Sequence, residues 1–238
     1  MLVTNKLSPN YSKKLRKKNK IRFIIIHYTG MQSEIESIKR LKNLKSKVSC
    51  HYLINRKGII MRMVDEKYEA WHAGKSKWKN LVNLNKYSIG IELVNKGHKI
   101  RYENFSNTQI KSLIKLCSKL KRKYKIKKEN FLGHSDIAPL RKVDPGEKFP
   151  WKQLSKFNIG VWYKTRKLEI FKKTRDENNA KIFFKNLRKI GYRYFNISKR
   201  KRSDARIIKA FKSRYLQEDL SIKIDQKTLK ISHFLANC

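Results

Sequence analysis

Short apolar runs bounded by polar residues recur along the first two thirds of the chain. Runs of this kind, when they are rich in β-branched residues, predict buried strands. The strands predicted in this way cover residues 21–27, 51–55, 58–64, 88–94 and 131–134.

Apolar residues at helical spacing predict two helices between these strands. The first begins after Ser33, where Glu36 three residues later completes a capping-box pattern. The second covers about residues 108–123 and follows Ser106, which forms a similar pair with Gln109. The apolar stripe of the first helix consists of Ile35, Ile38, Leu41 and Leu44, and that of the second of Ile110, Leu113, Ile114, Cys117 and Leu120. Strands alternating with helices indicate an α/β or mixed α+β fold in which helices cover a sheet.

The two ends of the chain differ from this central part. Residues 1–20 are basic and polar, and we expect them to form a flexible lead before a domain of residues 21–164. Three short amphipathic segments follow, the last of them capped by Asp225, and they predict a small helical domain over residues 176–238. The boundary between the two domains is expected within residues 164–176.

Composition narrows the classes of protein that fit this pattern. The chain has 238 residues, of which 39% are hydrophobic, enough for a substantial core and too many for a wholly disordered chain. Its 60 Lys and Arg against 18 Asp and Glu give a formal net charge of +42, which admits a nucleic-acid or anionic-surface binder as one hypothesis. Most of this charge is diffuse, which is more typical of a solvated surface. The longest strongly apolar run, residues 23–26, is far short of the ~20 residues of a membrane-spanning helix.

Two histidines stand where predicted strands end and loops begin. His27 ends the strand of residues 21–27, and His134 ends that of residues 131–134. Functional sites of α/β sheets collect at strand ends. Asp144 follows His134 by ten residues in a loop. Two histidines and one carboxylate suit a catalytic zinc ion and leave its fourth position for water, although the three residues are far apart in the sequence.

Two charged residues complete a candidate site. Glu92 points away from the face that its apolar neighbours in the strand share. A carboxylate there is paired, hydrated or functional, because burying an unpaired charge is costly; the alternative is the wet face of an edge strand. Lys142, two residues before Asp144, projects to the same side of an extended segment, where it would stabilise a developing negative oxygen. An ordinary surface lysine is the competing interpretation.

Other residues leave alternatives open. Trp71 and Trp78 lie in an irregular, aromatic-rich loop that fits either a local core or a platform for a sugar or peptide. Asp136 is expected near the site as a partner of a metal ligand. His51 follows Cys50 in a strand, where adjacent side chains face opposite sides, so a structural role is favoured over a metal-binding pair.

Several motifs occur in the order found in one enzyme family. They are residues 26–29 (IHYT), 49–53 (SCHYL), 70–74 (AWHAG), 88–93 (SIGIEL) and 133–139 (GHSDIAP), followed by 141–146 (RKVDPG) and 149–151 (FPW). The sequence resembles the zinc-dependent N-acetylmuramoyl-L-alanine amidases of the Amidase_2 superfamily, in particular their AmiD-like branch, over about residues 21–163. The resemblance implies the mixed central sheet of the type 2 amidase fold. It also implies, less specifically, a C-terminal all-α domain of peptidoglycan-binding type.

The resemblance also implies an activity and a set of site residues. The family hydrolyses the amide bond between the lactyl group of N-acetylmuramic acid, or of its anhydro form, and L-alanine of the stem peptide in peptidoglycan or muropeptides. Its zinc ligands fall on His27, His134 and Asp144. Its catalytic glutamate, which takes a proton from water, falls on Glu92, and its oxyanion-stabilising lysine falls on Lys142. Family positions near the substrate groove match Tyr52, Trp71 and His72.

Two other classes of protein compete with an amidase. A peptidoglycan-recognition protein of the same fold would bind without cutting, but such binders typically lack a zinc ligand, and all three candidates are present here. A nucleic-acid or membrane-surface binder would explain the charge but not the ordered motifs. We therefore expect Zn²⁺ as cofactor and peptidoglycan fragments or muropeptides as partners, with no specific nucleic acid and no membrane span. Residues 1–20 show no apolar segment of a secretory signal, which favours the cytoplasm, whereas the resemblance to envelope amidases favours the periplasm or outer membrane.

Overall fold

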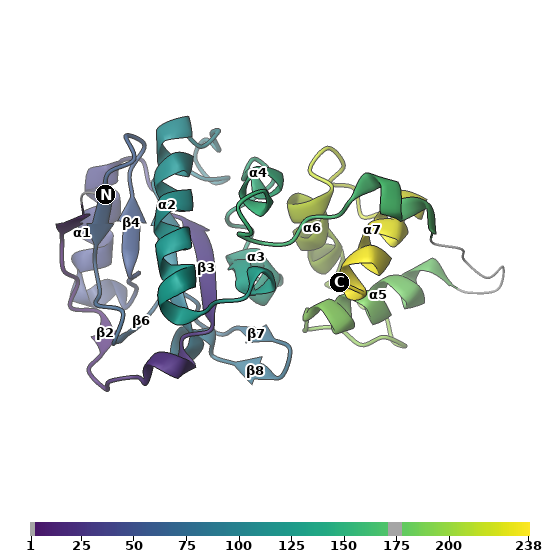
Figure 1. Cartoon of the computed structure of the whole chain (residues 1–238), viewed down its shortest axis with the longest axis horizontal. Coiled ribbons are helices and arrows are strands. Elements are labelled where there is room, and N and C mark those ends of the chain that lie inside the picture. The colour runs from purple at the N-terminus through teal and green to yellow at the C-terminus, as the bar shows by residue number, and fades with distance from the viewer. Residues whose placement is uncertain (1–2, 171–177) are drawn as a thin grey trace.

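The centre of the molecule is a mixed six-stranded sheet, seen in a computed structural model that describes residues 3–170 and 178–238 (Figure 1). The strand order is β1-β5-β4-β9-β3-β10. Within this sheet β4 and β5 are antiparallel, and the other neighbouring pairs are parallel. The bounds are β1 Val3–Asn5, β3 Phe23–Tyr28, β4 Tyr52–Ile54, β5 Ile60–Arg62, β9 Ser88–Leu93 and β10 Phe131–Gly133. The predicted mixed sheet is confirmed.

Strand β3 is buried on both faces, which explains why helices lie on either side of it. Its sequence, FIIIHY, is almost entirely apolar, as is typical of a central parallel strand. Ile24 and Ile26 belong to one core cluster with the apolar stripe of helix α2 (Asn107–Tyr124). Phe23 and Ile25, which alternate with them, belong to a different cluster on the other side.

This second side of the sheet is covered by one helix near β4 and β5 and, separately, by three helices from the C-terminal part of the chain. Helix α1 (Glu34–Lys42) contributes Leu41 to a small core with β4 and β5. Three C-terminal helices contribute to the larger core that includes Phe23 and Ile25, and Figure 1 shows them gathered on the far side of α3 and α4 from the strands. These helices are α5 Asn179–Ile190, α6 Asp204–Tyr215 and α7 Gln226–Ala236. They confirm the three predicted amphipathic segments.

The N-terminal segment differs from the expected flexible lead. Strand β1 pairs in parallel with β5 at the edge of the sheet. Asn10 is fully buried, and its side-chain amide donates to the carbonyl oxygens of Asn43 and Val48. Within the described residues 3–20, strand pairing and the buried amide of Asn10 fix the segment. The basic composition of the segment predicts neither contact.

The predicted helix caps are correct, but one predicted apolar stripe is not. Ser33 Oγ accepts a hydrogen bond of 3.1 Å from the backbone N–H of Glu36. In the same helix Ile35 is 66% exposed, and Leu44 beyond its end is 67% exposed. Helix α1 therefore contacts the sheet through a narrower stripe centred on Leu41, because it covers only the β4–β5 side.

Shorter elements connect the main ones. They are β2 Tyr11–Ser12, β6 Glu69–Ala70, β7 Lys77–Trp78, β8 Leu81–Val82, α3 His134–Ile137, α4 Trp151–Ser155 and the 3-10 helices η1 Lys18–Lys20, η2 Leu44–Ser46, η3 Leu84–Tyr87, η4 Lys128–Asn130 and η5 Thr165–Ile170. The expected boundary at residues 164–176 lies partly outside the described residues, and the division into two domains stays a prediction. Across the described part of the chain, no helix is long and apolar enough to cross a membrane.

Candidate metal centre

The registers of three neighbouring strands assemble the candidate site. In the pairing of β3 with β9, His27 lies opposite Glu92. In the pairing of β10 with β3, Gly133 lies opposite Ile26, so His134, the first residue of α3, follows beside His27. Parallel strands thus bring residues that are far apart in the sequence to one edge of the sheet.

Asp144 completes a group of three buried side chains whose donor atoms converge. His27 Nδ1 lies 2.9 Å from His134 Nδ1, and Asp144 Oδ2 lies 3.1 Å from each of these nitrogens. Ligands held about 2.0–2.1 Å from a tetrahedral zinc ion are roughly 3.3 Å from one another. The observed separations therefore fit three ligands of one small ion, and the residues predicted as metal ligands form a single buried triad.

Hydrogen bonds on the outer side of each imidazole direct its Nδ1 towards the centre. His134 Nε2 lies 3.2 Å from the carbonyl oxygen of Ala73, which can only accept, and 3.3 Å from Arg141 Nη2, which itself donates to that oxygen. The proton of His134 is therefore assigned to Nε2. His27 Nε2 lies 3.0 Å from His72 Nδ1, and His72 Nε2 lies 3.2 Å from Ser88 Oγ. The Ser88 hydroxyl donates elsewhere, so it accepts from His72, and His72 in turn accepts from His27. Both Nδ1 lone pairs are thus free for a cation, as in metal-bound histidines.

The ionisation of the triad also suits a cation. Burial, together with the neighbouring His134, lowers the pKa of His27 to about 4. Burial alone would raise the pKa of Asp144, but His134 and His27 outweigh it and hold that pKa far below its usual range. A neutral imidazole and an ionised carboxylate are the forms that bind metal ions.

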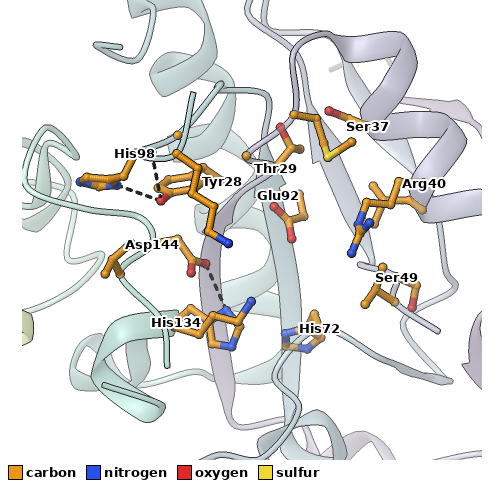
Figure 2. Close-up of a pocket in the computed structure, with 18 of the residues that line it drawn as sticks. Tyr28, Thr29, Ser37, Arg40, Ser49, His72, Glu92, His98, His134 and Asp144 are labelled. Carbon is orange, nitrogen blue, oxygen red and sulfur yellow. Dashed lines mark hydrogen bonds and ion pairs between the residues drawn. The ribbon is translucent and has the colours of Figure 1, made fainter. Parts of the chain in front are cut away.

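Two members of the triad, His134 and Asp144, line a cavity of about 450 Å³. Figure 2 shows His134 and Asp144 on one side of this cavity and Arg40 and Ser49 on the other, with the Glu92 carboxylate pointing into the space between them. The cavity therefore lies where the sheet is left uncovered between α1 and the α3 side of the molecule.

Glu92 is the candidate acid–base group of this cavity. Its Oε2 is buried and has no hydrogen-bond partner within residues 3–170 and 178–238. Burial, with the nearby Asp144, raises the pKa of Glu92 to about 8, and Lys142 opposes this rise. A carboxyl group with a pKa near neutrality is suited to exchange protons with a substrate or water at physiological pH.

Glu92→Gln is expected to stabilise the metal-free protein more and more as the pH rises. Because its pKa is raised, Glu92 holds its proton more tightly in the folded chain than in the unfolded chain. Ionisation between about pH 4.5 and pH 8 therefore lowers the free energy of unfolding of the wild type. Glutamine does not ionise and escapes this loss. Thermal unfolding of both metal-free proteins from about pH 5 to about pH 9 should show a growing difference in Tm; a constant difference would contradict the raised pKa.

The structure gives three of the other predicted residues a place at the cavity. Lys142, which is half-buried, and Trp71 both line it. His72 also lines it, but its two ring nitrogens are engaged by His27 and Ser88. His72 thus orients His27, one of the candidate metal ligands. The predicted position of His72 near the substrate does not include this role.

Tyr52 does not reach the cavity. Its ring joins the core on the α2 side of the sheet, and its hydroxyl donates to Glu66. In β4 it is the next residue, Leu53, that lies opposite Glu92 and shares the face of the site. The structure therefore places Tyr52 on the other face of β4, away from the groove expected for it, because side chains alternate between faces.

Gly90 makes room for the ring of His72. A Cβ at Gly90 would lie 2.3 Å from Cγ of His72, whose ring is buried. This close approach explains a glycine inside the apolar strand β9. It also connects that strand to the hydrogen bond that orients His27.

Gly90→Ala is expected to displace the His72 ring, to lower the free energy of unfolding by about 1–3 kcal/mol and to weaken zinc binding by about 10-fold. Chemical denaturation and a zinc competition assay measure the two effects. Ile91→Val, on the opposite face of the same strand, is the control and should lose stability without losing zinc affinity. An alanine variant with the affinity of the wild type would contradict the role given to His72.

Some residues of the cavity were not predicted. His98 lies in an exposed turn at the rim. Its Nδ1 lies 2.8 Å from Tyr28 Oη (Figure 2), and its Nε2 lies 3.0 Å from Glu147 Oε2. Arg141 donates to the carbonyl oxygen of Ala73, the group that also contacts His134. The chain has 60 basic residues, and what distinguishes Arg141 among them in the sequence is its position next to Lys142.

Asp136 and Trp78 have structural roles. The Asp136 carboxylate, expected to support a metal ligand directly, instead accepts from the backbone N–H of Gly133 and from the side chains of Tyr192 and Arg214. Trp78 is 3% exposed and packs edge-on against Tyr192, with ring centroids 5.0 Å apart. Of its two interpretations, the local core is the correct one.

Comparisons with known proteins agree with this geometry. Residues 17–147 match the Amidase_2 family model, described as N-acetylmuramoyl-L-alanine amidase. The chain is 39% identical to the N-acetylmuramoyl-L-alanine amidase AmiD of Escherichia coli over 164 residues, which are 64% of this chain and 58% of that protein. It is 39% identical over 108 residues to the 1,6-anhydro-N-acetylmuramyl-L-alanine amidase AmpD of Haemophilus influenzae, which are 45% of this chain and 56% of that protein. These matches span little more than half of the relatives' own length.

Solved structures extend the similarity over nearly the whole chain. E. coli AmiD, in complex with the substrate anhydro-N-acetylmuramic acid-L-Ala-D-γ-Glu-L-Lys, has a TM-score of 0.82 and 32% identity, and the match covers 95% of this chain and 91% of that one. AmpDh3 of Pseudomonas aeruginosa has a TM-score of 0.82 and 28% identity, with 96% of each chain covered. Because the family model matches more than half of its residues, the chain belongs to the Amidase_2 family of N-acetylmuramoyl-L-alanine amidases.

Proposed function

We propose that this chain is a zinc-dependent N-acetylmuramoyl-L-alanine amidase. It would cleave the amide bond between the lactyl group of N-acetylmuramic acid, or its anhydro form, and L-alanine of the stem peptide. The observation that carries this proposal is the buried triad of His27, His134 and Asp144 with converging donor atoms, beside which Glu92 faces the cavity. The AmiD structure with an anhydro-muropeptide and the AmpDh3 structure with an anhydromuramic pentapeptide support the substrate class.

The side chains around the triad suggest how the bond is broken. A bound zinc ion supplies Lewis acidity and lowers the pKa of a water molecule. Glu92 takes a proton from the attacking water and passes one to the leaving nitrogen of L-alanine, so that a lactyl carboxylate and a free amine are formed. Lys142 stabilises the negative charge that develops on the carbonyl oxygen. His72 keeps the His27 ring in the orientation that the metal requires.

Cationic side chains in the cavity wall suit the carboxylates of a stem peptide. Arg40, Lys99 and Arg141 line the cavity together with Lys142. Trp71 adds an aromatic surface for a sugar or peptide. We assign these residues to substrate binding within the proposed reaction.

The helices α5, α6 and α7 are proposed to belong to a domain of the peptidoglycan-binding type. The structural similarity to AmiD and AmpDh3 supports this assignment, because it covers 95% and 96% of the chain and so reaches into these helices.

Digestion of one defined substrate tests the proposed function. The zinc-loaded chain is incubated with anhydro-N-acetylmuramic acid-L-Ala-D-γ-Glu-L-Lys, and the products are identified by mass spectrometry. The expected products are the free anhydro sugar acid and a peptide that begins with L-alanine. An uncut substrate, or a cut at any other bond, would contradict the proposal.

A further inference from the structure

We infer that the C-terminal helices complete the metal centre. Arg214 of α6 and Tyr192, which follows α5, are positioning residues that hold His134 in place through Asp136. The inference rests on the proposed function in one respect, because it takes the buried triad as a zinc site.

Strand β10 lies at one edge of the central sheet. In the sheet of the described residues, β10 is the last strand and pairs with β3 on one side. Backbone groups on the other side of such a strand need other partners. Nη2 of Arg214 donates to the carbonyl oxygen of Phe131 over 2.9 Å, and the N–H of Gly133 donates to Asp136 Oδ2 over 2.7 Å. Both ends of β10 are thus held, one of them by α6 directly.

Asp136 is the point at which these contacts meet. It lies in the first turn of α3, two residues after His134, and is 1% exposed. One oxygen accepts from Gly133 and from the guanidinium of Arg214, and the other accepts from the hydroxyl of Tyr192. A buried carboxylate that loses its cation is strongly destabilised, so this pair ties the start of α3 to the C-terminal helices.

Arg214 is itself held firmly. It is 3% exposed, and its guanidinium lies over the ring of Trp151, 4.0 Å from the centroid. A displacement of α6 would therefore also displace Phe131 and Gly133, which precede His134 in the chain. Direct hydrogen-bond partners of a metal ligand typically change metal affinity by about 10–100-fold when they are lost. Arg214 acts through Asp136 and the backbone before His134, so its effect is expected to be smaller.

Zinc affinity of the full chain, measured by competition with a chromophoric chelator, tests the inference. Arg214→Met removes the cation and keeps most of the aliphatic stem, and we expect zinc binding to weaken by up to about 10-fold, the lower end of the effect of a direct ligand partner. Tyr192→Phe removes one hydroxyl and keeps the buried ring, and we expect a smaller loss in the same direction. The readout does not depend on amidase activity.

Lys212→Met is the matched control. Lys212 lies on the same helix, is fully buried and contacts Asp219 at 2.6 Å and Ser221 at 3.2 Å, both within the C-terminal part. Its substitution should lower Tm, because it leaves the half-buried Asp219 without its cation. It should leave zinc affinity within about twofold of the wild type, because none of these contacts reaches Asp136.

The outcomes separate the inference from the proposed function. If Arg214→Met and Tyr192→Phe bind zinc as tightly as the wild type, or if Lys212→Met weakens binding as much as Arg214→Met, the inference is overturned. If Arg214→Met does not fold, Tyr192→Phe compared with Lys212→Met decides. A wild-type chain that binds no zinc would overturn the proposed function and this inference with it.

Discussion

Replacing Glu92 with glutamine is expected to lower amidase turnover by about 10²–10⁴-fold, while one zinc ion per chain is retained. Glutamine has nearly the same shape but cannot accept the proton of the attacking water. The zinc candidates are His27, His134 and Asp144, and their converging atoms do not include the Glu92 carboxylate. Measurement of kcat on a defined anhydro-muropeptide, with elemental analysis of the same sample, separates the two effects.

An acidic residue outside the cavity lining provides the control. The carboxylate of Glu147 pairs at 3.0 Å with His98, a residue of the cavity rim. Glu147→Gln makes the same chemical change outside the reacting centre, and turnover should stay within a few-fold of the wild type. A Glu92→Gln variant that keeps nearly full activity would show that another group moves the proton.

His27→Ala is expected to remove both zinc and activity. The substitution deletes one of three donor atoms and leaves His134 and Asp144 without the geometry that three ligands provide. The loss of zinc affinity should exceed the roughly 10–100-fold that follows loss of a supporting residue. Zinc content after dialysis, measured beside His98→Ala as a histidine control at the rim, checks this. One tightly bound zinc ion in His27→Ala would exclude His27 as a ligand.

The chemistry of the site could be predicted from the sequence because strand patterns are local. His27 and His134 each follow a short apolar run, and parallel registers bring such strand ends together. The face of Glu92 followed from the alternation of side chains in β9. The same alternation places Tyr52 of β4 on the opposite face, away from the groove that the resemblance implies for it.

Contacts between distant segments could not be predicted in this way. The pairing of β1 with β5 and the burial of Asn10 depend on partners that lie far along the chain. The contact of Asp136 with Arg214 joins residues 78 positions apart, and in a chain with 60 basic residues nothing marks Arg214 among them. The hydrogen bond between His72 and His27 could not be predicted either, because it forms only when the loop that carries His72 folds over Gly90.

The central claim is that the triad of His27, His134 and Asp144 holds the zinc ion on which catalysis depends. Its most direct test is a zinc titration of the chelator-treated chain, with hydrolysis of the anhydro-muropeptide followed at each step. Activity should be lost on chelation, return in proportion to added zinc and level off at one ion per chain. Activity that survives removal of the metal would contradict the account.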